Sequence, residues 1–98
     1  MPNPTTPTIP TEELAVVDFQ ADWCAPCKIM SPIAHRVTAD LGLRLIEVDV
    51  DENPELASRY AVMSIPTLLV FSAGQPVERI VGAVPERELR VRLAAVLA

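Results

Sequence analysis

Two cysteines with two residues between them are the part of this chain best suited to chemistry. They form the segment Cys24-Ala25-Pro26-Cys27, which follows an apolar run at residues 14–19 and opens a stretch with helical spacing. A cysteine at the start of a helix lies near unpaired backbone amides and the positive end of the helix dipole, and both lower the pKa of a thiol. The second cysteine, one turn later, can attack a mixed disulfide formed on the first. The spacing therefore predicts dithiol–disulfide exchange, with metal binding as the alternative.

The number of available ligands limits the metal alternative. A structural zinc ion takes four protein ligands, whereas this chain has two cysteines and one histidine, His35. His35 follows Cys27 on the same predicted helix, about 12 Å further along its axis, so it cannot complete a site with the cysteine pair of its own chain. We interpret His35 as a surface or half-buried residue of the helix and not as a catalyst, and we expect no bound metal. A dimer that shares four cysteines through a metal remains open.

The composition is that of one globular domain. The chain has 98 residues, half of them hydrophobic, and a net charge of -5 without a basic stripe, which does not favour nucleic acid or an anionic membrane surface as a partner. No apolar run approaches the roughly 20 residues needed to span a bilayer, and the first residues do not resemble a secretory signal. Two cysteines are too few for a disulfide scaffold. We therefore expect a cytoplasmic protein.

Apolar periodicity and turn signals predict an α/β domain with the order β-α-β-α-β-β-α. The strands are expected at residues 14–19, 43–50, 67–71 and 77–81, and the helices at 24–41, 53–60 and 85–97. The first two strands should be parallel because a helix joins them, and the last two should form a hairpin. Pro32 should kink the first helix near Lys28, and the side chain of Asn53 should cap the second.

Residues 1–12 differ from the rest of the chain. Four prolines fall among threonines within the first ten residues, and proline lacks the backbone donor that a helix interior needs. We interpret this segment as a Pro/Thr-rich tail, flexible or extended, and place the folded domain at residues 13–98.

Three motifs within residues 14–98 resemble those of the thioredoxin family. Residues 16–28, VVDFQADWCAPCK, resemble its active-site segment; 63–68, MSIPTL, resemble its cis-proline loop; and 81–83, VGA, resemble its substrate-groove glycine. The resemblance implies a thioredoxin fold, with a central mixed sheet of about four strands flanked by helices. The family normally has a strand and a helix before the strand at Leu14, so we expect that helix to be missing and the first strand to be missing or reduced to an extended strip.

The resemblance also implies roles for individual residues. Cys24 would attack a target disulfide, and Cys27 would resolve the mixed intermediate, leaving a redox-active Cys24–Cys27 disulfide. Asp18 would be the buried carboxylate behind Cys27 that accepts its proton. A flat apolar surface would hold the target chain, with Pro66 in the cis form. The residues of that surface would be Trp23, Ala25, Pro26, Ile65, Pro66, Gly82 and Ala83.

The implied activity is protein-disulfide reduction. Electrons would come from NADPH through a flavin-containing thioredoxin reductase, with no cofactor bound to this chain, and the partners would be that reductase and disulfide-containing client proteins. No histidine separates the two cysteines to stabilise a thiolate, so we expect a reductant and not an oxidant. A binding or assembly module on a shortened thioredoxin scaffold, with incidental redox activity, is the alternative.

Departures from the family pattern affect the site and its surroundings. Glu47 occupies a position where many bacterial thioredoxins carry lysine, and Gln20 replaces a common tryptophan. If Glu47 faces Asp18, the pKa of Asp18 should rise, from burial first and from like charge second. We expect Lys28 and Glu47 to modulate the site. The missing N-terminal unit should uncover one sheet face and one strand edge, which favours a homodimer through either.

Overall fold

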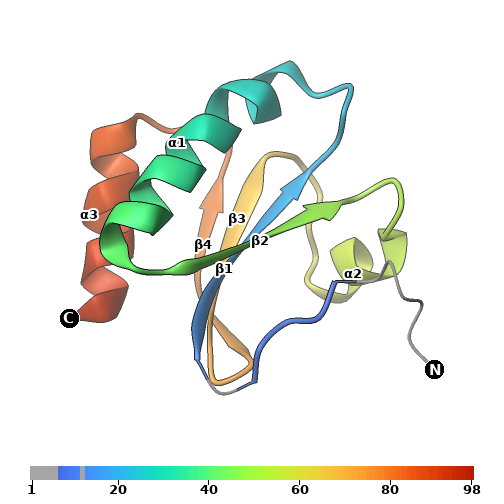
Figure 1. Cartoon of the computed structure of the whole chain (residues 1–98). Helices are drawn as coiled ribbons and strands as arrows, with labels where there is room; N and C mark the ends of the chain where they lie inside the picture. The colour runs from blue at the N-terminus through green and yellow to red at the C-terminus, as the bar shows by residue number, and fades with distance from the viewer. Residues whose placement is uncertain (1–6, 12) are drawn as a thin grey trace.

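The computed structural model describes residues 7–11 and 13–98, and the chain has the predicted order of strands and helices (Figure 1). The strands are β1 Leu14–Gln20, β2 Arg44–Asp49, β3 Thr67–Ser72 and β4 Gln75–Val81, and the helices are α1 Ala25–Leu41, α2 Pro54–Arg59 and α3 Glu86–Leu97. The predicted α/β class is thereby confirmed. None of the helices in the described ranges is long and apolar enough to cross a membrane.

A four-stranded mixed sheet with the order β2-β1-β3-β4 lies at the centre of the molecule. β1 runs parallel to β2 and antiparallel to β3, and β3 pairs with β4 as an antiparallel hairpin. Both strand pairings expected from the sequence are confirmed. Asp18 on β1 lies in register with Glu47 on β2 and with Leu68 on β3. The strand order alone therefore places two of the predicted site residues side by side.

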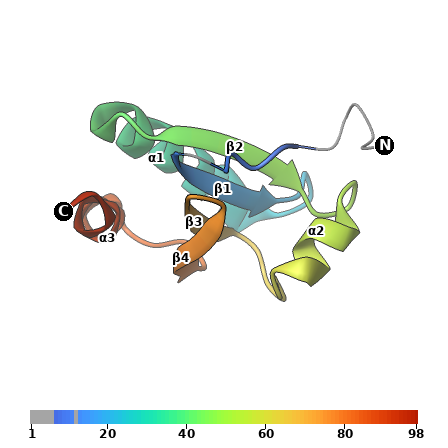
Figure 2. The ribbon, with the colours of Figure 1, turned by 90° about the horizontal axis from the view of Figure 1, so that it is seen from below.

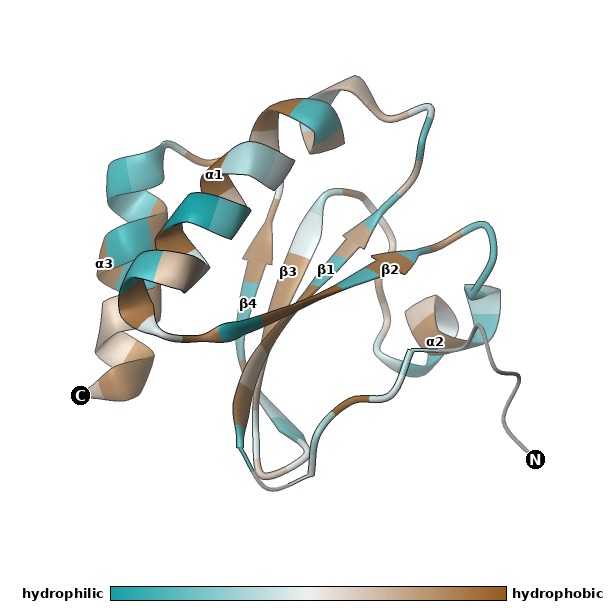
Figure 3. Ribbon diagram, viewed as in Figure 1, coloured by the Kyte–Doolittle hydropathy of each residue, from teal (hydrophilic) through white to brown (hydrophobic). Residues whose placement is uncertain are grey.

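Helices α1 and α3 cover one face of the sheet, whereas α2 lies on the other (Figure 2). The apolar residues of α1 lie mainly on its side toward the strands (Figure 3). We call the buried cluster beneath α1 and α3 the large core; it consists of Val16, Met30, Ala34, Val37, Leu68, Val70, Ile80, Leu89 and Leu93. Full burial of one such larger aliphatic side chain stabilises a fold by about 1.5–3 kcal/mol, so the large core holds α1 firmly on the sheet.

The opposite face of the sheet has a second cluster, beneath α2. This small core consists of Val17, Phe19, Val48, Ala57, Leu69 and Phe71. The ring of Tyr60, directly after α2, meets the ring of Phe71 edge-on with centroids 5.1 Å apart, a favourable aromatic geometry. The side chains of β1 and β3 on this face are at most 1% exposed. The prediction that one sheet face is uncovered is therefore wrong for the two central strands.

The N-terminal segment contributes to that cover. Ile9 is half-buried and packs against the small core, and the backbone of Thr11 lies against Gly74 in the β3–β4 turn. Residues 7–11 form no strand or helix, so part of the proposed tail is an extended segment in contact with the domain. The predictions made for residues 1–6 and for residue 12 lie outside the described residues. Within the described ranges β2 and β4 are the two edge strands of the sheet, and a homodimer through a strand edge stays a prediction.

The predicted cap of α2 is wrong. Asn53 occupies the N-cap position, but its side chain makes no capping hydrogen bond. Its amide instead donates to the backbone carbonyl of Asp49, 3.0 Å away. The carboxylate of Asp49 accepts the N–H groups of Asp51 and Glu52 at 2.8 and 3.3 Å. The turn after β2 is thus organised by an aspartate at the end of the strand, which leaves Asn53 turned back toward that strand.

Removal of the Ile9 side chain tests the contact of the N-terminal segment. We expect Ile9→Ala to lower the free energy of unfolding by about 1 kcal/mol, less than the 2–5 kcal/mol of a fully buried aliphatic site. Urea unfolding of the oxidised protein at pH 7 measures the change, with Thr8→Ala, at an exposed position, as the control. Equal stability of the Ile9→Ala variant and the wild type would contradict the contact.

Candidate active site

The cysteine pair lies where β1 gives way to the first turn of α1. Cys24 is the N-cap residue of this 17-residue helix, and its Sγ accepts the backbone N–H of Cys27 at 3.1 Å. The two sulfur atoms form a disulfide, with the Cα atoms 5.2 Å apart. Pro26 falls in the first turn, where a helix has no use for the missing N–H. A thiolate on Cys24 would therefore lie at the positive end of α1 with an amide donor already directed at it.

The disulfide packs against an apolar surface from two other segments. Ala21, Cys24 and Cys27 form a buried cluster, against which the half-buried Val50 and Ile65 pack. The cysteines are only 3% and 2% exposed, respectively, although Ala25 and Pro26 between them are exposed. A target chain would therefore approach over the spacer residues and over the loop that carries Ile65.

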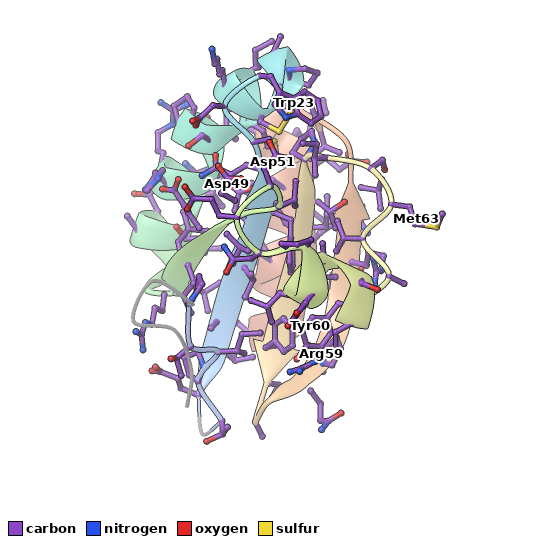
Figure 4. All side chains as sticks on the ribbon, turned by 90° about the vertical axis from the view of Figure 1, so that its right-hand side faces the viewer. Trp23, Asp49, Asp51, Arg59, Tyr60 and Met63 are labelled. Atoms are coloured by element: carbon purple, nitrogen blue, oxygen red, sulfur yellow. A yellow bond between two sulfur atoms is a disulfide. The ribbon has the colours of Figure 1, made fainter. Side chains whose placement is uncertain are left out.

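Trp23 is the large aromatic side chain beside the disulfide (Figure 4). Its indole is 69% exposed, and its Nε1–H donates to the Asp51 carboxylate at 2.7 Å. The same turn that Asp49 organises therefore holds the orientation of Trp23. The sequence analysis did not identify Asp51, because the contact joins residues 28 positions apart across the end of the sheet.

The predicted proline loop lies opposite the cysteines and has the expected backbone. The Ile65–Pro66 peptide bond is cis. The carbonyl of Pro66 accepts the N–H of Gly82 at 2.8 Å, where the chain leaves β4. Gly82 has a φ of +85°, a left-handed conformation that favours glycine. Because Ile65 touches the cysteine cluster and Pro66 bonds to Gly82, three separate segments of the predicted target surface meet here.

Other predicted surface residues are accessible around this point. Ala83 is exposed, and Met63, at the start of the proline loop, is 94% exposed. Figure 4 shows the Met63 side chain projecting away from the molecule. Pro66 itself is buried, so its contribution is to the shape of the loop.

Asp18 is the buried carboxyl group of the site. Its side chain is 1% exposed, and its Oδ1 has no hydrogen-bond partner among the described residues. It lies on the α1 side of β1, as does Val16 of the large core, because side chains alternate along a strand. Burial, together with the negative charge of Glu47, raises the pKa of Asp18 to about 6, while His35 acts in the opposite direction. The order of causes agrees with that expected from the sequence.

Of the two residues expected to modulate the site, Glu47 is the one that acts on Asp18. One Glu47 oxygen accepts from the side-chain amide of Gln20 at 2.6 Å, and the other lies 2.5 Å from Nε2 of His35. Lys28 is exposed on the first turn of α1, and its role at the site stays a prediction. His35 is a surface residue as predicted, but its contact with Glu47 was not foreseen.

Comparison with known proteins agrees with this geometry. The family model described as Thioredoxin matches residues 7–95. The chain belongs to the thioredoxin family. It is 49% identical over 76 residues to a thioredoxin of Staphylococcus aureus, a match that covers 76% of this chain and 73% of the relative. Thioredoxins from other strains of that species match equally well.

A solved structure of a family member also resembles the chain. It is an asparagine-to-glutamine mutant of thioredoxin from Halobacterium salinarum, which matches with a TM-score of 0.81 and 36% identity over 86% of this chain and 74% of that one. The mixed four-stranded sheet is thus a thioredoxin fold. Membership of the family, together with the Cys24–Cys27 pair, supports a dithiol–disulfide redox function for this chain. In the described ranges no group of three His, Cys, Asp or Glu side chains is arranged to hold a metal ion.

The buried carboxyl group predicts how stability depends on pH. The pKa of Asp18 is raised from 3.8 to about 6 in the folded protein, so the folded state holds a proton that the unfolded chain has lost. The contribution of Asp18 to the free energy of unfolding is fully present below pH 3.8, and it is lost as the pH rises through 6. Asp18→Asn cannot titrate, so the stability of this variant relative to wild type should increase by about 1 kcal/mol between pH 5 and pH 8.

Urea unfolding of the oxidised proteins at pH 5 and pH 8 measures this difference. Asp51→Asn is the matched control, because Asp51 is exposed and the same change of charge is made outside the buried site. A relative stability of Asp18→Asn that is the same at both pH values would show that Asp18 has no raised pKa.

Proposed function

We propose that the protein reduces disulfides in client proteins by exchange with its own cysteine pair. The observation that carries the proposal is the position of Cys24: its sulfur caps α1 and accepts the N–H of Cys27. This arrangement stabilises a thiolate more than a neutral thiol, because the amide and the helix dipole both favour negative charge. The thiolate is the nucleophile in disulfide exchange.

The reduction takes two exchange steps. In the first, the Cys24 thiolate attacks one sulfur of the client disulfide; a Cys24–client bond forms, the client S–S bond breaks, and the second client sulfur leaves as a thiolate. In the second, the Cys27 thiolate attacks Sγ of Cys24 and releases the remaining client sulfur as a thiolate. The client gains two electrons, and the cysteine pair loses two and forms the Cys24–Cys27 disulfide.

Asp18 is proposed as the base for the second step. Cys27 must lose a proton before it attacks, and Asp18 lies on the sheet face that α1 covers. A pKa of about 6 suits this work, since a base is most useful when its pKa is near the working pH. Oδ1 has no partner among the described residues, which leaves it free to accept the proton directly or through water.

The client would lie across the surface formed by Trp23, the Ala25-Pro26 spacer, the loop at Ile65 and the turn at Gly82. Main-chain groups at Ile65 would bind an extended segment, and the exposed apolar side chains would contact its residues. We propose that a flavin-containing thioredoxin reductase returns electrons from NADPH to the disulfide, and that the exchange takes place in the cytoplasm. The chain itself would need no bound cofactor.

Serine variants of the two cysteines test the proposal. We expect wild type to accelerate the reduction of insulin by dithiothreitol, and Cys24→Ser to fall to the rate of dithiothreitol alone, because the attacking sulfur is lost. Cys27→Ser should form mixed disulfides with clients that it cannot resolve, seen as covalent adducts on non-reducing gels. Ser31→Ala, elsewhere on α1, is the control and should retain the wild-type rate.

Equal rates for wild type and Cys24→Ser would reject the reductase. Client binding that survives in the Cys24→Ser variant, without turnover, would instead support a binding or assembly module.

A further inference from the structure

A polar cluster lies beside Asp18 on the outer part of the sheet. It consists of Gln20 on β1, Glu47 on β2 and His35 on α1. The amide of Gln20 and the imidazole of His35 each hold a different oxygen of the Glu47 carboxylate, at 2.6 and 2.5 Å. Both side chains of the His35–Glu47 pair are partly in contact with solvent, at 56% and 38% exposure. The orientation of Glu47 is therefore fixed from two sides, although its carboxylate is partly exposed to solvent.

The crossover from β1 to β2 places this cluster next to the buried carboxyl group. Because β1 and β2 are parallel, the helix between them runs back over both strands. Its first turn carries Cys27 above the end of β1, and His35, two turns later, reaches Glu47 on β2. Glu47 is itself the register partner of Asp18. Glu47 is thus the register neighbour of the buried carboxyl group and the hydrogen-bond partner of an imidazole that is partly exposed to solvent.

Few ionisable groups face Asp18 from the surrounding elements. β2 supplies Glu47 and α1 supplies His35, and these are the two charges that act on Asp18. β3 supplies the apolar Leu68 as register partner. The carboxylate of Asp49, further along β2, is engaged by the amides of the following turn. The neighbours of His35 one turn away on α1 are uncharged; they are Ser31, Pro32, Thr38 and Ala39.

We propose that His35 is a positioning residue for proton transfer at Asp18, acting through its pair with Glu47. With a charged imidazole, the pair has no net charge and Asp18 ionises more readily. With a neutral imidazole, the negative charge of Glu47 acts on Asp18 without compensation, and Asp18 keeps its proton more strongly. The proposal rests on the proposed function, in which Asp18 takes the proton of Cys27.

The pair would give the exchange reaction a dependence on pH that a fixed lysine cannot supply. Histidine side chains ordinarily change charge between pH 5 and 8, the range in which Asp18 itself titrates. A purely structural role of the His35–Glu47 pair would have a different effect. An exposed ion pair contributes at most about 1 kcal/mol to stability, and in that role it would leave the ionisation of Asp18 unchanged.

Two substitutions that fix the charge of position 35 test the proposal. The readout is the titration midpoint of the Asp18 carboxyl carbon in the oxidised protein, followed by NMR. We expect His35→Gln, which is neutral, to raise the midpoint by about 0.5 to 1 unit. His35→Lys, which stays charged, should hold it at or below the wild-type value. Arg36→Gln is the matched control, because Arg36 pairs with Glu86 on α3 and should leave Asp18 unchanged.

A double variant shows whether Glu47 is required. Glu47→Gln alone should lower the midpoint, since it removes the like charge. In the Glu47→Gln background, His35→Gln should shift the Asp18 midpoint by at most half as much as it does in the wild-type background, because the imidazole is no longer held in place. A midpoint unmoved by His35→Gln, or moved equally by Arg36→Gln, would overturn the proposal.

The pH profile of insulin reduction supplies the second readout. We expect His35→Gln to shift it toward higher pH by about the same amount as the Asp18 midpoint. The two failures are distinguishable: absence of insulin reduction by wild type rejects the reductase, whereas normal reduction with an unmoved Asp18 midpoint rejects only the role of His35.

Discussion

The packing of α1 on β1 and β2 is the contact on which the rest of the site depends. Met30, Ala34 and Val37 are buried in the large core, and this fixes both the height and the rotation of the helix above the strands. The N-terminal turn then lies over the end of β1, with the sulfur of Cys24 at the cap. The same rotation brings His35 to Glu47 on the neighbouring strand. One apolar stripe therefore positions the reacting sulfurs and the polar cluster together.

Within this frame the structure retains a group that opposes stability. A buried carboxyl oxygen such as Oδ1 of Asp18, without a hydrogen-bond partner among the described residues, is costly to a fold, and a second carboxylate in register on β2 increases that cost. The unfavourable placement is what gives Asp18 a proton affinity suited to exchanging protons near neutral pH. Stability is reduced at the position where the proposed exchange reaction would use a base.

The sequence predicted the features that depend on local pattern and on connection rules. The parallel β1–β2 pair, the β3–β4 hairpin and the influence of Glu47 on Asp18 all follow from such rules, while the cis bond before Pro66 came from the resemblance alone. The predictions that failed depend on which side chain reaches a given hydrogen-bond partner or apolar surface in the folded structure. The side chain of Asn53 bonds the carbonyl of Asp49 and not the first amides of α2, and a single apolar contact from Ile9 is hidden within a proline-rich segment. The contact of His35 with Glu47 depends on the rotation of α1 about its own axis, and the apolar periodicity of the sequence specifies that rotation only coarsely.

Trp23 gives the molecule an optical property that follows from its position. It is the only tryptophan of the chain, it directly precedes the disulfide, and Asp51 holds its indole in one orientation. A disulfide close to an indole quenches its fluorescence by accepting an electron from the excited ring. The tryptophan emission of this protein therefore comes from a single site adjacent to the reacting sulfurs, and it should report their oxidation state in real time without a label.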